Sequence, residues 1–116
     1  METLIKASLV LNIAVLVPVC GSLLAGAGWT ASAYGPPSPA RGILLSIYLA
    51  ILLVSAGLLF RPVPAMVAAL LVVQILYKVT TPVTVGTLAN PVVLSNLAIA
   101  AFHMVTVRAI AMKAGL

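Results

Sequence analysis

The stretch from Gly42 to Phe60 reads GILLSIYLAILLVSAGLLF and contains no charged residue. A helix needs about 20 apolar residues to cross the hydrocarbon core of a bilayer, at ~1.5 Å rise per residue. The segment 51–54 (ILLV) lacks the alternation of polar and apolar residues that a membrane β-strand needs. Residues 61–64 (RPVP) follow at once and leave only a tight turn before the next apolar run. The two runs are therefore predicted to form an antiparallel helical hairpin in a membrane.

The composition of the whole chain indicates the same surroundings. Of its 116 residues, 64% are hydrophobic and 6% are charged, whereas a soluble domain has about 25% charged residues. The formal net charge is +5, but the basic residues are scattered along the chain. Nucleic acid is not an expected partner, because phosphate binding needs a clustered basic patch. We expect the lipid bilayer as one partner and, as protein partners, another membrane protein or further copies of this chain.

Four apolar runs are predicted to form membrane-spanning helices, the third of which is short. The predicted spans are residues 3–27, 42–60, 64–79 and 92–112. Residues 29–40 are rich in Gly, Pro and Ser and are predicted to form the longest loop. Asn90 is predicted to cap the last helix, with Pro91 at its first position. The expected fold is all-α, an integral membrane antiparallel four-helix transmembrane bundle that forms a single domain over residues 1–116.

Basic residues are distributed unevenly between the two faces of such a bundle. The face that holds both termini has four of them: Lys6, Arg61, Arg108 and Lys113. The opposite face has two: Arg41 and Lys78. Cytoplasmic loops of membrane proteins carry the excess of Lys and Arg. The sequence therefore predicts a multi-pass protein of the cell membrane with both termini in the cytoplasm.

Polar side chains within the spans are the candidates for function, because burying them in a bilayer is costly. Residue counts from the basic anchors place Asn12, Ser55 and His103 at one depth, ~8 to 9 Å inside the boundary of the face with the termini. We predict that these three side chains form interhelical polar contacts. A second polar layer is predicted toward the opposite face. The candidates for a ligand site or a pathway are Lys78, Gln74, Tyr77, Asn96 and His103.

The two ionisable candidates each have a structural alternative. His103 would act in a proton relay or touch a ligand, or it would hydrogen-bond to Asn12 or Ser55 as a structural residue. Lys78 would bind an anionic solute or head group, or its ammonium would reach the membrane interface from the end of the third span. We treat the structural interpretation as the expected one for both residues.

Catalytic chemistry has few residues to draw on. The only acidic side chain is Glu2, and the chain has one His and one Cys. This set supports neither acid–base catalysis, nor a metal site of three or four ligands, nor an internal disulfide. We expect no enzyme activity, no cofactor and no metal. The leading hypothesis is an accessory or assembly subunit of a membrane complex. The alternatives are a small oligomeric transporter or channel for a small or anionic solute, and a lipid- or quinone-binding module.

The layout of four spans in a short chain resembles that of small multidrug transporters, fluoride channels and DoxX-like proteins. The resemblance is one of architecture. The first span has Asn12 as its strong polar group and lacks the membrane-embedded glutamate expected of the multidrug transporters. Thr80 and Thr81 are followed by Pro82, which departs from the Thr-Thr-Phe-Ser pattern of the fluoride channels. These residues assign the chain to none of the three families.

Overall fold

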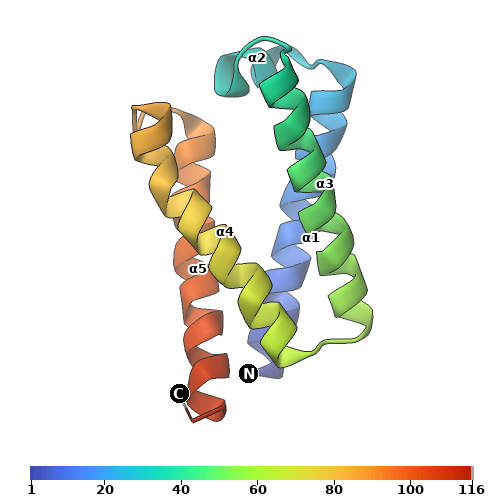
Figure 1. The fold of residues 1–116 in the computed structure, drawn as a ribbon, viewed down its shortest axis with the longest axis vertical. Coiled ribbons are helices and arrows are strands. Elements are labelled where there is room, and N and C mark those ends of the chain that lie inside the picture. Colours follow the sequence, from blue (N-terminus) through green and yellow to red (C-terminus); the bar gives the residue numbers. More distant parts are fainter. Residues whose placement is uncertain (116) are drawn as a thin grey trace. The chain divides into compact units, whose positions relative to one another are not determined.

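The computed structural model describes residues 1–115, and over this range the chain is all-helical, as predicted. Its helices are α1 (Glu2–Ala25), α2 (Gly28–Tyr34), α3 (Pro39–Phe60), α4 (Pro64–Val85) and α5 (Pro91–Lys113). The helices α1, α3, α4 and α5 are long and apolar enough to cross a membrane (Figure 1). The chain is therefore a small multi-pass membrane protein, and its four long helices are compatible with the predicted four-helix bundle.

Contacts divide the chain into two compact units, and α1 contributes to both. The first unit joins Met1–Ser8 to the chain from Arg61 onward, and the second comprises Leu9–Phe60. In the first unit, α4 and α5 pack against each other as an antiparallel hairpin, drawn in yellow to red in Figure 1. In the second unit, Asn12 of α1 donates a hydrogen bond to Ser55 Oγ of α3, at 3.1 Å. Each unit therefore joins segments that are distant in the sequence.

The start of α5 confirms the predicted capping pattern. The Asn90 side chain accepts a hydrogen bond from the Val92 N–H at 2.8 Å, and Pro91 occupies the first turn. This arrangement is stable because the cap pairs one free amide of the first turn, and proline has no N–H there to leave unpaired. The hairpin turn of the first unit therefore ends at a well-defined residue.

The helix α4 is longer than predicted. The predicted span ended at Val79, with residues 80–91 as a connection, whereas α4 continues to Val85 and has 22 residues. Gly86 follows with φ 87° in the left-handed conformation, which glycine adopts without steric cost and which ends many helices. The prediction of a short third span is therefore wrong.

A side-chain hydrogen bond explains how α4 passes through a proline. Pro82 has no N–H to donate to the carbonyl of Lys78, four residues earlier. Thr81 Oγ1 donates to that carbonyl instead, at 2.6 Å. In the same way Thr80 Oγ1 donates to the carbonyl of Tyr77 at 2.8 Å. Threonine hydroxyls thus donate to backbone carbonyls in the turn of α4 where the sequence had predicted that the helix would end.

Replacing Thr81 by valine is expected to loosen the last turn of α4. Valine keeps the β-branched shape but removes the donor, which leaves the Lys78 carbonyl unpaired at a cost of about 1 kcal/mol. Hydrogen exchange of the amides in residues 83–85 should accelerate in Thr81→Val. The matched control is Thr84→Val, because Thr84 is exposed and its hydroxyl bond to the Thr81 carbonyl is 3.5 Å long. Equal exchange in the two variants would contradict this explanation.

A short helix occupies much of the segment predicted as the longest loop. The helix α2 ends at Tyr34 and is followed by Gly35, which has φ 88°. The helix α3 then begins at Pro39 instead of Gly42, and Ser38 Oγ accepts a hydrogen bond from the Arg41 N–H at 3.1 Å. The loop prediction is wrong over most of its length because the prolines stand only at its end, leaving the earlier residues free to be helical.

Candidate functional site

Lys78 is buried within α4, with 5% of the residue exposed. Its Nζ lies 3.4 Å from Asn96 Oδ1 of α5 and 5.2 Å from the centre of the Tyr77 ring. Lys78 does not lie at the end of its helix, because α4 continues to Val85. The α4–α5 hairpin therefore brings three of the predicted ligand or pathway candidates together at one buried position.

Among residues 1–115, the charge of Lys78 has no acidic partner. An ammonium has three N–H donors, and the 3.4 Å bond to the neutral amide of Asn96 uses one of them weakly. The only acidic side chain, Glu2, lines a pocket together with Pro64 at the start of α4. That position is ~20 Å along the helix from Lys78. The site therefore offers a buried positive charge with spare hydrogen-bond donors.

Gln74 lies one helical turn before Lys78, so both side chains share a face of α4. Gln74 is 1% exposed, and its Nε2 donates to the carbonyl of Leu70 in the same helix at 3.5 Å. The structure thus places Gln74 beside the Lys78 position along the helix but pairs it with its own backbone. It adds a second buried polar group to this face without changing the charge.

His103 is fully buried on α5 and takes part in a chain of polar contacts with α1. Its Nδ1 lies 3.1 Å from Ser8 Oγ, which lies 2.7 Å from Thr106 Oγ1. Thr106 Oγ1 also donates to the carbonyl of Leu4 at 3.4 Å. Counting depths from Lys6 did not identify Ser8 as a partner of His103, because Ser8 comes only two residues after that anchor.

The hydrogen bond from Thr106 to the Leu4 carbonyl fixes which groups donate and which accept in this cluster. A carbonyl only accepts, so Thr106 uses its one proton on Leu4, Ser8 then donates to Thr106, and His103 Nδ1 donates to Ser8. A proton passed along this path would stop at the Leu4 carbonyl, which cannot pass it on. We therefore interpret the cluster as a structural link between the first two turns of α1 and the second half of α5.

Arg41 has a structural role that its sequence context did not indicate. It is 8% exposed, its Nη1 donates to the carbonyl of Gly35, and its Nη2 donates to Thr30 Oγ1, both at 2.9 Å. These two acceptors lie in and directly after α2. Arg41 therefore fastens α2 to the start of α3. No spacing pattern in the sequence could have revealed this, because the acceptors are a backbone carbonyl and a single hydroxyl.

Aromatic packing supports the same junction. The ring of Tyr34 lies 6.1 Å from that of Trp29 and 6.0 Å from that of Tyr48, measured between centroids. Burial raises the pKa of the Tyr34 hydroxyl, its hydrogen bond with Tyr48 lowers it in part, and the neighbouring Cys20 raises it further. The phenol therefore stays protonated at neutral pH, so the contacts that hold α2 through this ring are uncharged.

Within residues 1–115, no three His, Cys, Asp or Glu side chains lie close enough to hold a metal ion. Every buried side-chain nitrogen and oxygen in that range has at least one hydrogen-bond partner. The distinguishing feature of the site is therefore the unbalanced charge of Lys78. No family model, curated protein or solved structure matches the chain.

Proposed function

We propose that this membrane protein is not an enzyme and that it binds a small monovalent anion at Lys78, as part of a small transporter or channel. The observation that carries the proposal is the burial of an ammonium whose only hydrogen-bond acceptor in the described part of the chain is the neutral amide of Asn96. Ionisable residues inside membrane spans are costly, and they commonly mark the path or site of a solute.

Charge balance defines the class of solute. Two charges of opposite sign attract strongly in a medium of low dielectric constant, and an unpaired buried charge is destabilising. A monovalent anion would neutralise Lys78, whereas a divalent anion would leave a net negative charge in the membrane. The amides of Gln74 and Asn96 would supply further N–H groups to an anion bound there.

Flux in vesicles tests the proposal. The purified protein is placed in phosphatidylcholine vesicles, and entry of chloride, nitrate or acetate is followed with an anion-sensitive dye while potassium and valinomycin balance the charge. We expect protein-dependent flux of at least one of these monovalent anions and none of sulfate. A folded protein that carries none of the three faster than empty vesicles would refute the proposal.

The accessory-subunit hypothesis is the second candidate, and the same unbalanced charge favours it. A membrane-embedded carboxylate of a partner subunit would then take the place of the solute anion beside Lys78. Native mass spectrometry of the protein extracted gently from its own membrane separates the two. A larger complex with another protein supports the subunit hypothesis, and a bare monomer or homo-oligomer supports the transporter.

The predicted orientation can be tested by cysteine labelling. Ser38 and Met112 are both exposed, so a cysteine at either site is open to a membrane-impermeant thiol reagent. The native Cys20 is buried and gives little background. With both termini in the cytoplasm, Ser38→Cys should label in intact cells and Met112→Cys only after the membrane is opened. The reverse pattern would overturn the predicted topology.

A further inference from the structure

A groove opens between α4 and α5 at the end of the hairpin where α4 begins and α5 ends. Its volume is about 590 Å³, within the range of about 300 to 1,000 Å³ typical of ligand pockets. Four alanines line it, and their small side chains leave the space open: Ala65, Ala68, Ala111 and Ala114. Valine and isoleucine line it further along both helices. The groove therefore suits an apolar occupant.

A second pocket of about 490 Å³ adjoins the groove and is more polar. Both are lined by Met1, Pro64 and Lys113, and the second is also lined by Glu2 and Thr3. The second pocket offers the ammonium of Lys113 and the hydroxyl of Thr3 beside the carboxylate of Glu2. An apolar groove that continues into a polar pocket has the two-part character of a phospholipid. Lys113 lies where the two parts meet.

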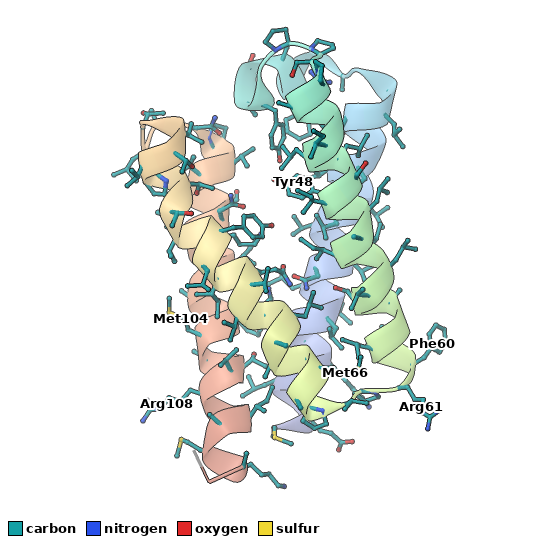
Figure 2. All side chains as sticks on the ribbon, in the orientation of Figure 1. Tyr48, Phe60, Arg61, Met66, Met104 and Arg108 are labelled. Atoms are coloured by element: carbon teal, nitrogen blue, oxygen red, sulfur yellow. The ribbon has the colours of Figure 1, made fainter. Side chains whose placement is uncertain are left out.

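Exposed charge in the first unit as a whole is mostly positive. Glu2 is the only acidic side chain in the sequence. The exposed basic residues of the first unit are Lys6, Arg61, Arg108 and Lys113. Figure 2 shows the side chains of Arg61 and Arg108 extending away from the ribbon. Basic residues at the end of a membrane span attract anionic lipids.

We propose that this unit binds one anionic glycerophospholipid, with an acyl chain in the alanine-lined groove and the phosphate beside Lys113. The hairpin consists of two helices that are apolar enough to cross a membrane, so the apolar molecules available to this groove are lipids. The exposed basic residues of this unit outnumber its one acidic residue, Glu2, and this net positive charge favours an anionic head group. This site is separate from Lys78, which lies toward the other end of α4.

Lipid retention in native mass spectrometry tests the head-group part of the proposal. The protein is exchanged into mixed micelles with dioleoyl phosphatidylglycerol, phosphatidylcholine or phosphatidylethanolamine at equal concentration. We expect one phosphatidylglycerol to be retained in preference to the others. Lys113→Gln should lower that preference about fivefold, and Lys6→Gln, which removes the same charge outside the two pockets, should lower it less. Better retention of phosphatidylethanolamine, or equal effects of the two variants, would overturn the proposal.

A pair of alanine variants tests the groove. Ala111→Leu fills the groove and should reduce retention of all three lipids, since they share the same acyl chains. Ala98→Leu adds the same side chain at an exposed position of α5 outside the groove and should retain phosphatidylglycerol as the wild type does. Equal retention by Ala111→Leu and Ala98→Leu would show that the groove does not hold the lipid.

Discussion

Anion flux is expected to disappear when Lys78 is replaced by glutamine. Glutamine keeps an N–H donor for Asn96 but removes the positive charge, so the bound anion loses its only counter-charge. Loss of one partner from a buried charge pair costs several kcal/mol, so we expect affinity to fall about a hundredfold or more. The measurement is the vesicle flux assay, with the anion that the wild-type protein carries fastest.

Two further variants separate charge from folding. Lys78→Arg keeps the charge and should keep part of the flux, whereas Lys6→Gln removes an exposed cation and should leave flux unchanged. Thermal melting in detergent should not fall in Lys78→Gln, because removing an unbalanced buried charge relieves its desolvation cost. Unchanged flux in Lys78→Gln, or equal losses of flux in Lys78→Gln and Lys6→Gln, would contradict the role given to Lys78.

Replacing Arg41 by methionine is expected to release α2 from α3. Methionine has a similar apolar stem but leaves the Gly35 carbonyl and the Thr30 hydroxyl without the donors that now lie 2.9 Å away. Hydrogen bonds to charged groups contribute about 1.5 to 3 kcal/mol each, so the loss of stability should reach about 2 kcal/mol or more. Trp29, the only tryptophan in the chain, lies in α2, and its fluorescence should shift to longer wavelength.

The control for this variant is Arg61→Met, which removes an exposed arginine next to the start of α4. Its unfolding midpoint and its Trp29 emission should match those of the wild type. Arg41→Lys should fall between the two, because an ammonium cannot reach both acceptors in the planar geometry of a guanidinium. Wild-type emission and stability in Arg41→Met would show that Arg41 does not hold α2.

The number and approximate limits of the long helices could be predicted because hydropathy alone decides them. A bilayer leaves a backbone only a few ways to pair its polar groups, so a long apolar run such as 42–60 has to be helical. The cap at Asn90 and Pro91 was also predictable, because it depends on two adjacent residues. Most of the fold therefore follows from two things: the need to pair backbone polar groups within a membrane, and short local sequence patterns such as helix caps.

The end of α4 could not be predicted because it depends on a hydrogen bond that competes with a strong pattern. Pro82 is expected to end a helix, but α4 continues past it, with Thr81 donating to the Lys78 carbonyl that the proline leaves unpaired. The error matters for the site. With α4 ending at Val79, Lys78 would be a helix-end residue, whereas in the structure it lies within α4 and is 5% exposed.

The candidate site was predictable in its residue types and only partly in its contacts. Residue counts along each helix put Asn12 and Ser55 at one depth, and the structure joins them. The pairing of Lys78 with Asn96 and of His103 with Ser8 depends on how helices are rotated about their axes. The rotation of each helix is set by the packing of many side chains between helices. Counting residues along a single helix gives no information about that packing.

The most direct test of an anion site at Lys78 is nuclear magnetic resonance of the protein labelled with ¹⁵N at its lysine Nζ atoms. The chain has only three lysines, Lys6, Lys78 and Lys113, and the Lys78 signal is identified by its loss in Lys78→Arg. Titration with the carried anion should shift the Lys78 signal to saturation and leave the other two nearly unchanged. A Lys78 signal that does not respond, or three signals that drift together with ionic strength, would contradict anion binding at Lys78.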